Sequence, residues 1–337
     1  MKYAFSFLVV TALALIAGLG SMIPGTQYLF GVAIPYLAVA IFLFGFVYKV
    51  VNWAKSPVPF SIQTTCGQGK SLDFIKHNKL EAPQTKLQVM ARMFLEVVFF
   101  RSLFRNTKAE LHDGPKLTHE SSKWLWLFAL IFHYCFLLIV VRHLRLFLDP
   151  VPAAIAWVEY FDGIMQIGAP RWYMTSVGLP FACILLFGRR LWNRQVRYIS
   201  LMNDYFPLVL IFGIAVTGIL MRYFLHVDII TTKEMLIGLA TFSPVVGGTL
   251  PGIFCIHILL VSVLLACFPY SKLMHSGGVF MSPTRNMTNA SRAVRHINPW
   301  NPEIKPHSYA GYEDEFREFM VEAGLPVDKE LPASKEA

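Results

Sequence analysis

Charged side chains and cysteine motifs are scarce in this sequence. Only 15% of its 337 residues are Asp, Glu, Lys or Arg, against about 25% in soluble globular proteins. The five cysteines include no C-x-x-C pair, which excludes the usual iron–sulfur, zinc and c-type haem motifs. No Asp or Glu interrupts the long apolar runs and no internal repeat is found, which argues against a transporter with carboxylates at mid-membrane.

Long apolar runs dominate the sequence. Hydrophobic residues make up 55% of the chain, and the run 124–141 contains eighteen consecutive uncharged residues, enough to cross a hydrocarbon core of about 30 Å as a helix. We therefore expect an all-α integral membrane protein built as a bundle of six helices. The expected spans are residues 3–22, 28–51, 124–141, 173–191, 205–225 and 252–270.

Lysine and arginine are distributed unevenly among the connections. Twelve fall between Lys49 and Lys123, four between Arg189 and Arg197, and eight from Lys272 onward. Because cytoplasmic loops carry an excess of Lys and Arg, we expect a multi-pass protein of the cytoplasmic membrane with both termini in the cytoplasm. The same excess explains the formal charge of +9 without a nucleic-acid partner.

Four histidines lie in or near two of the runs. His133 and His143 belong to the third run, and His257 and His275 lie in and after the sixth. An ionisable ring in a membrane is costly and by default marks function. Neutral imidazole is a good iron ligand, and iron held by two histidines passes electrons without an open coordination position. The alternative is that these rings form hydrogen bonds between helices without a metal.

The spacing of the histidines leaves room for two haem groups. Ten residues of helix separate His133 from His143 by about 15 Å. Eighteen helical residues would separate His257 from His275 by about 27 Å, so Pro269 is expected to bend or end the helix and let His275 return.

Cations and acids at the edges of the runs complete the candidate site. Haem propionates would emerge near the arginines at the outer edge. In the quinone-linked role that the family resemblance described below implies, Arg171 could stabilise a quinone, and Glu159 or Asp162 could relay protons. For these last three residues a solvated surface loop is the favoured interpretation. The cations assigned to haem propionates or a quinone are Arg142, Arg145, Arg171, Arg222 and Lys272.

The segments IFH at 131–133 and FPYSKLMH at 268–275, with ligand spacings of ten and eighteen residues, resemble the gamma subunit of respiratory nitrate reductase. The signature F-P-[FY]-S-[RK]-L-x-H carries much of this resemblance. It implies two haems b between the third and sixth spans. His143 would pair with His257 at the outer haem, and His133 with His275 at the inner haem.

Further segments are similar to the DsrM-type cytochrome b of the membrane complex associated with dissimilatory sulfite reduction. They are FFRSLFRNTKAELHDG, SSKWLWL, SPTRN and RAVRHINPWNPE. This resemblance implies a menaquinol/menaquinone site near the outer haem and an electron-transfer role in a quinone-linked oxidoreductase. The implied partners are a cytoplasmic iron–sulfur subunit like heterodisulfide reductase, further membrane subunits, a periplasmic multihaem cytochrome c and membrane lipid.

The expected organisation follows from this resemblance. Residues 1–27 form an extra, uncleaved span, 28–276 the dihaem domain with the long cytoplasmic loop 52–122, and 277–337 a cytoplasmic tail that docks a partner. Short helices are expected at 86–105 on the membrane surface, at 151–170 and at 312–323. The alternatives are a haem-free membrane anchor, a transporter subunit, and a related nitrate reductase gamma or heterodisulfide reductase-type cytochrome b.

Overall fold

Six long apolar helices dominate the computed structural model, which describes residues 2–56, 67–105, 108–114, 116–165, 170–246, 250–290, 294 and 306–329. Each is long and apolar enough to cross a membrane. The prediction of a six-helix membrane bundle is therefore confirmed. The six helices are Lys2–Gly20, Thr26–Ala54, Lys123–Leu146, Met174–Trp192, Met202–Phe224 and Gly252–Tyr270.

Several of these spans are composite. The second contains α2 (Thr26–Tyr28), a π-helical turn and α3 (Ile34–Ala54), and the third is α6 (Lys123–His143) with a short 3-10 turn. The fifth is α10 (Met202–Ile219), which ends in a π-helical turn over Leu220–Phe224. The first, fourth and sixth spans are α1 (Lys2–Gly20), α8 (Met174–Trp192) and α12 (Gly252–Cys267) with a 3-10 turn.

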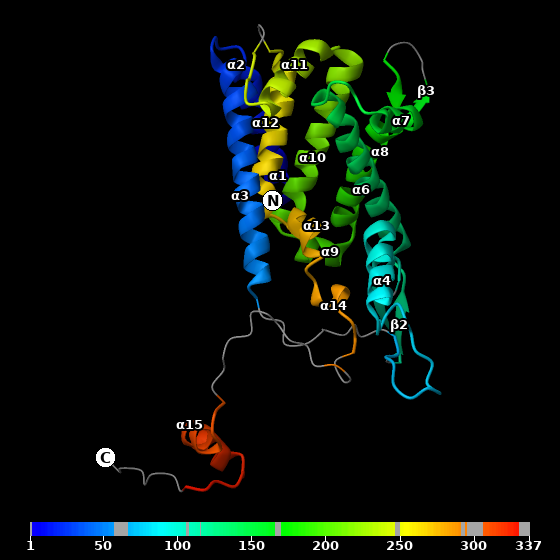
Figure 1. Cartoon of the computed structure of the whole chain (residues 1–337), viewed down its shortest axis with the longest axis vertical. Helices are drawn as coiled ribbons and strands as arrows, with labels where there is room; N and C mark the ends of the chain where they lie inside the picture. The colour runs from blue at the N-terminus through cyan, green and yellow to red at the C-terminus, as the bar shows by residue number, and fades with distance from the viewer. Residues whose placement is uncertain are drawn as a thin grey trace, which may run out of the picture.

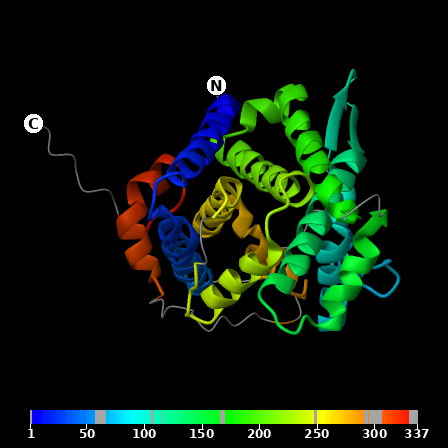
Figure 2. The ribbon, with the colours of Figure 1, turned by 90° about the horizontal axis from the view of Figure 1, so that it is seen from above.

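Helix α12 lies in the middle of the bundle. It packs against α1, α3 and α10, while α6 joins the bundle through its contact with α8. The view from above shows the same arrangement, with the yellow α12 enclosed by neighbouring helices (Figure 2). The two histidine-bearing spans are thus held by different neighbours. Helix α6 packs against α8 and α12 packs against α10, and α8 and α10 contact each other (Figure 1).

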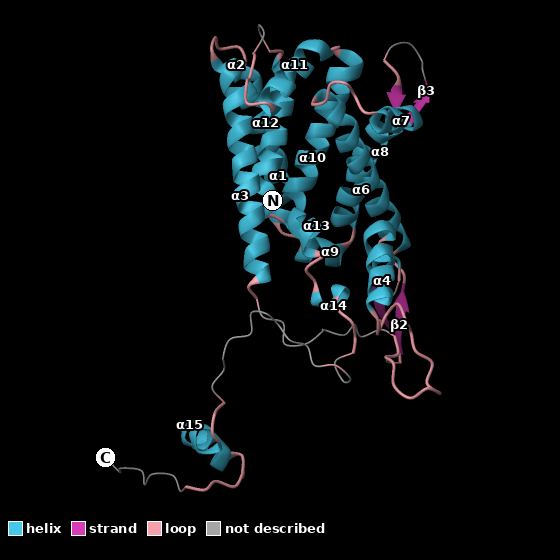
Figure 3. Ribbon diagram, viewed as in Figure 1, coloured by secondary structure: helices cyan, strands magenta, loops and turns pink. Residues whose placement is uncertain are grey.

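Two short hairpins lie at opposite ends of the bundle (Figure 3). Strands β1 (Lys108–His112) and β2 (Lys116–Glu120) pair antiparallel around Asp113-Gly114, and Gly114 adopts a left-handed φ of 82°. Strands β3 (Gly163–Met165) and β4 (Trp172–Tyr173) form the other pair. We call the end with α4 and β1–β2 the α4 end, and the end with α7 and β3–β4 the α7 end.

Shorter helices cover both ends. Helices are present where short helices were expected, at α4 (Lys86–Phe99) with α5 (Arg101–Phe104), at α7 (Ala153–Asp162) and, in the tail, at α15 (Tyr309–Glu322). Helix α4 stands upright beside α6 (Figure 1), whereas a helix lying on a membrane surface would run across the bundle. The expected orientation of 86–105 along the membrane surface is therefore wrong. The remaining short helices are α9 (Arg194–Ile199), α11 (Ile229–Ala240), α13 (His275–Gly278) and α14 (Pro283–Asn286).

Among the elements that were not expected from the sequence, α11 and the β1–β2 hairpin each have a local signal. The cap of α11 is Asp228, whose carboxylate accepts hydrogen bonds from Ile230 N at 3.0 Å and Thr231 N at 3.2 Å, as an N-cap residue does. Asp-Gly between two strands is a common hairpin turn. In the tail, the aromatic residue Phe316 lies in α15, whereas Trp300 is outside the described residues.

Candidate functional site

The structure brings His133 and His275 together at the α4 end. His133 lies in α6, and His275 begins α13. Their ring centroids are 5.8 Å apart and the ring planes are nearly perpendicular, at 85°. Because a metal–imidazole bond is about 2 Å long, one metal ion between these rings could contact both.

A turn after α12 delivers His275 to this position. The helix ends at Cys267, and two 3-10 turns over Phe268–Tyr270 and Lys272–Met274 redirect the chain. Pro269 is buried against α3, where a Cβ on Gly45 would stand only 2.9 Å from the Pro269 Cβ. Glycine at this position therefore permits the close approach that fixes the turn.

The second pair consists of His143 at the end of α6 and His257 in α12. The two rings are close enough to interact electrostatically. Gly218 of α10 faces the His257 ring, and a Cβ there would lie 3.5 Å from the imidazole Cε1. Both rings of this pair come from long helices, without an intervening turn.

Hydrogen bonds hold Nδ1 of all four rings. A backbone carbonyl four residues earlier accepts from His133 and from His143, both at 2.7 Å, and the carbonyl of Lys272 accepts from His275 at 2.6 Å. Thr217 Oγ1 lies 2.8 Å from Nδ1 of His257 and donates its own proton to the Gly213 carbonyl, at 2.9 Å. Because carbonyls only accept, each Nδ1 carries the proton and each Nε2 keeps a free lone pair.

This donor set fits haem. A ligating histidine commonly donates its other ring N–H to a carbonyl or similar acceptor, which fixes the tautomer. The described residues contain no group of three or more His, Cys, Asp or Glu that could hold a metal ion by themselves. Two pairs of neutral imidazoles are what the axial positions of two haems require.

A buried ion pair lies beside His143 at the α7 end. The guanidinium of Arg142 is 3.0 Å from the carboxylate of Asp162, and their side chains are only 9% and 2% exposed. The carboxylate also accepts from Thr175, from N at 3.0 Å and from Oγ1 at 2.6 Å. The expectation of a solvated surface loop is therefore wrong for Asp162, which is 4% exposed.

Arg222, like Arg171, is a cation of this end that has no carboxylate partner among the described residues. Its Nε is buried without a hydrogen-bond partner, and its guanidinium lies over the Tyr173 ring at 4.4 Å. Arg142 lies over the same ring at 3.8 Å. Arg222 belongs to the π-helical turn that ends α10, and such turns are frequent at functional sites.

The other three predicted cations lie at the rims of the bundle. Arg145 binds both carboxylate oxygens of Glu159, at 2.8 and 3.0 Å. Lys272 is 2.6 Å from Asp204 at the α4 end. Arg171 lies over the Tyr160 ring at 5.9 Å. Of the five predicted cations, three thus already have a carboxylate partner within the chain.

Sequence reasoning missed three polar residues of the site, namely Thr175, Thr217 and Tyr173. Thr217 lies in a predicted span, where a hydroxyl in an apolar run is a weak signal because it usually bonds to its own helix. Thr175 and Tyr173 follow Arg171 at the start of α8, and only the fold places them beside Arg142.

Comparison with known proteins gives a consistent picture. The family model described as nitrate reductase gamma subunit matches residues 96–296, a segment that includes all four histidines. The chain is 45% identical over 285 residues to the Hdr-like menaquinol oxidoreductase cytochrome b-like subunit of Archaeoglobus fulgidus, covering 82% of this chain and 85% of the relative. The protein of the same name from Archaeoglobus profundus is 41% identical over 277 residues, covering 80% and 82%.

Proposed function

Because the chain belongs to the nitrate reductase gamma subunit family, we propose that it is a membrane cytochrome b subunit that exchanges electrons with menaquinol or menaquinone. The single observation that carries this proposal is the hydrogen bonding of the four histidines. Each Nδ1 is bound by a backbone carbonyl or by Thr217, which leaves four Nε2 atoms in two pairs.

The proposal assigns one haem b to each pair. His143 and His257 would hold the haem of the α7 end, and His133 and His275 would hold the haem of the α4 end. A haem held by two histidines would supply one-electron transfer, since it has no open coordination position. The chain itself fixes the orientation and tautomer of each ring through the Nδ1 hydrogen bonds.

We place the menaquinol or menaquinone site at the α7 end, among its polar groups. Arg222, whose Nε is buried without a partner, is placed to meet an anionic group such as a haem propionate or a quinone oxygen. Arg142 is already neutralised by Asp162, so its role is to hold Tyr173 and the end of α6 in place. Arg145 and Arg171 lie at the rim, where they would meet propionates or the quinone at the entrance.

The α4 end is assigned to the cytoplasm, where most of the Lys and Arg residues of the loops gather. We place a cytoplasmic iron–sulfur subunit like heterodisulfide reductase there, with Lys272 beside the haem of that end and the tail 277–337 contributing to docking. The relatives' printed name, Hdr-like menaquinol oxidoreductase, supports this type of complex. A multihaem cytochrome c on the opposite side and a role in sulfite metabolism complete the proposal.

A spectrum of the purified subunit tests the core of this proposal. We expect a b-type band in the reduced-minus-oxidised difference spectrum and about two haems per chain, fully reducible by a menaquinol analogue in the intact complex. A purified, folded subunit without b-type haem would refute the proposal and favour a haem-free anchor. One haem per chain would refute the assignment of two pairs.

A further inference from the structure

Helix α4 has inverted polarity. Its buried face carries an arginine and a glutamate, while its exposed face is apolar. Arg92 is 2% exposed and Glu96 5%, whereas three hydrophobic residues on the other face are more than half exposed. These exposed residues are Leu87 at 74%, Met90 at 67% and Phe94 at 58%. A contiguous exposed apolar face of this kind marks an interaction surface.

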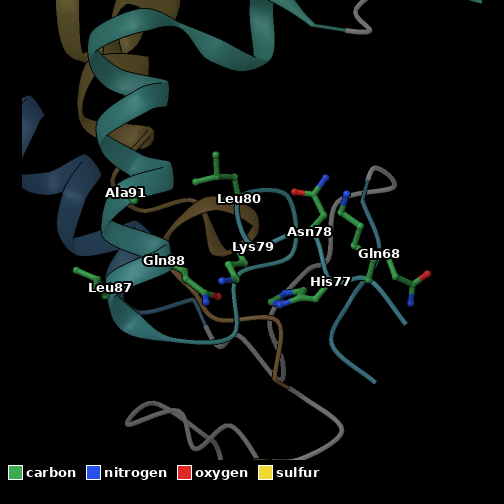
Figure 4. Close-up of a pocket in the computed structure, with 9 residues that line it drawn as sticks. Gln68, His77, Asn78, Lys79, Leu80, Leu87, Gln88 and Ala91 are labelled. Atoms are coloured by element: carbon green, nitrogen blue, oxygen red, sulfur yellow. The ribbon is translucent and has the colours of Figure 1, made fainter. Parts of the chain in front are cut away.

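A groove borders this face. It lies between α4 and the loop 67–80, and has a volume of about 840 Å³. Figure 4 shows Leu87 and Ala91 on α4, with Leu80, His77 and Lys79 on the loop. Lys76 and Lys79 are exposed at its rim. The groove is therefore apolar inside and basic at its edge.

The beginning of the tail is already anchored beside this groove. Arg285 of α14 forms an ion pair with the buried Glu96 at 2.9 Å. Farther along, the Gln84 side-chain amide donates to the Asn289 carbonyl at 2.6 Å, and Gln84 N donates to Gln88 Oε1 at 2.8 Å. Because Gln88 lines the groove, the tail leaves the bundle at the edge of the groove.

The tail helix α15 has the shape and polarity that this groove would accept. Its exposed aromatic side chains recur at helical spacing and form a stripe about 15 Å long. The stripe consists of Tyr309 (55% exposed), Tyr312 (49%), Phe316 (36%) and Phe319 (66%). Amphipathic helices with anchors at such spacing commonly bind in apolar grooves.

The polar face of α15 is acidic. Residues 309–322 contain five carboxylates and one arginine. Hydrogen bonds from the backbone N–H of Asp328 and Lys329, together with Arg317, keep the pKa of Glu313 below its usual value. Hydrogen bonds from Lys329 and Arg317 lower the pKa of Asp314. Glu313 is buried and Asp314 is paired with Arg317 and Lys329. The exposed carboxylates Glu315, Glu318 and Glu322 remain on the surface of the helix, opposite in sign to the rim of the groove.

In Figure 1 α15 lies apart from this groove. We propose a second position for α15, in the groove between α4 and the loop 67–80 of its own chain, with its aromatic stripe toward Leu87 and its acidic face toward Lys76 and Lys79. The fifteen residues 291–305 that join the two parts can extend to about 50 Å, which is ample because the tail starts at the groove's edge. The acidic charge of α15 disfavours a membrane surface, since interfacial helices are usually rich in Lys and Arg.

Disulfide trapping in the full-length protein tests this proposal. In a Leu87→Cys/Phe316→Cys variant, mild oxidation is expected to give an intrachain disulfide, identified by peptide mass spectrometry and by monomer mobility on a non-reducing gel. The matched control is Leu87→Cys/Glu318→Cys, which moves the second cysteine to the opposite face of α15. We expect at least tenfold less cross-link in this control.

Three outcomes would overturn the proposal. Equal cross-linking of both variants would indicate that α15 only collides with the groove through its tether and does not bind there in one orientation. A cross-linked dimer would identify a second copy as the occupant. Protection of Phe316→Cys from a thiol reagent only on adding lipid vesicles, or only in the complex with its other subunits, would identify a membrane or a separate protein as the occupant.

A second test uses the same cysteine pair and changes the charge at the rim of the groove. Replacing Lys76 and Lys79 by glutamate in the Leu87→Cys/Phe316→Cys background is expected to lower the cross-link yield severalfold at low salt. Lys116→Glu, a single charge reversal on β2, should leave the yield unchanged, whereas Lys76→Glu or Lys79→Glu alone should lower it. An equal loss with Lys116→Glu would contradict the proposal. These measurements need no haem or quinol, so their failure would leave the b-type spectrum and the proposed function intact.

Discussion

The two histidine pairs lie in different chemical surroundings. At the α4 end, His133 is flanked by aromatic rings, with Phe100 at 5.0 Å and Phe132 at 5.1 Å. At the α7 end, His143 adjoins a buried ion pair between Arg142 and Asp162. Buried charge near a membrane is costly, and at the α7 end the ion pair offsets this cost while Arg142 packs over the Tyr173 ring.

The pairs also differ in how their rings are presented. Both rings of the α7 end come from long helices and are oriented by bonds to α6 and α10. At the α4 end one ring comes from a turn that depends on the contact between Pro269 and Gly45. This turn brings the second ligand to the part of the molecule where the loop and tail residues gather (Figure 1).

The largest expected effect comes from removing one ligand of either pair. His143→Ala should remove about half of the b-type haem, sparing the α4 end, and should abolish quinol-linked electron transfer. His133→Ala should remove the complementary half. Haem content and the residual difference spectra of the two variants measure this.

A control and a contradicting result are available for the ligand variants. His112→Ala changes an exposed histidine of β1 and should leave the spectrum unchanged. Identical residual spectra in His143→Ala and His133→Ala would show that the two pairs are not separate sites.

Asp162→Asn should have the next largest effect, because it leaves Arg142 buried without a countercharge. Breaking a buried pair in this way costs about 3 kcal/mol, so the thermal midpoint in detergent should fall by several degrees. Glu159→Gln removes the carboxylate of a more exposed pair with Arg145, and should cost less than about 1 kcal/mol. An equal fall in thermal midpoint in both variants would show that the buried Arg142–Asp162 pair is no more important for stability than the exposed Arg145–Glu159 pair.

Much of this architecture could be predicted from the sequence because hydrophobic runs report membrane spans directly. The six spans follow from the length of the apolar runs. The four histidines stand out because ionisable rings are rare in such runs, and α7 lies in a segment bounded by prolines. The tail helix expected at 312–323 begins within three residues of the observed start of α15.

The remaining features depend on tertiary contacts that a linear pattern does not encode. Asp162 follows a segment that reads as a surface loop, yet α6 and α8 enclose it through Arg142 and Thr175. His275 reaches His133 only because the chain turns after Pro269. The inverted polarity of α4 likewise arises from Arg285, which meets Glu96 from 189 residues away.

Thr217→Val tests the orientation of a ring at the α7 end with a smaller expected effect. The change removes the hydroxyl that accepts from His257 Nδ1, and loss of such a bond typically weakens metal binding 10–100-fold. We expect about tenfold weaker haem retention at this end, measured by competition with apomyoglobin, with no change at the α4 end. Ser262→Ala, which removes a buried hydroxyl bonded to the Ile258 carbonyl on α12, should leave retention at both ends unaltered.

Lys272→Gln should have the smallest effect and completes the comparison of the two ends. Its ion pair with Asp204 is short, but the lysine side chain is 64% exposed, so water already screens most of the interaction. The expected loss is less than about 1 kcal/mol, seen as a small change in thermal midpoint at low salt that disappears at high salt. His275 is held by the backbone carbonyl of Lys272 and not by its ammonium group, so haem content should not change. A loss of haem as large as that in His133→Ala would mean that fixed charge governs the α4 end as it does the α7 end.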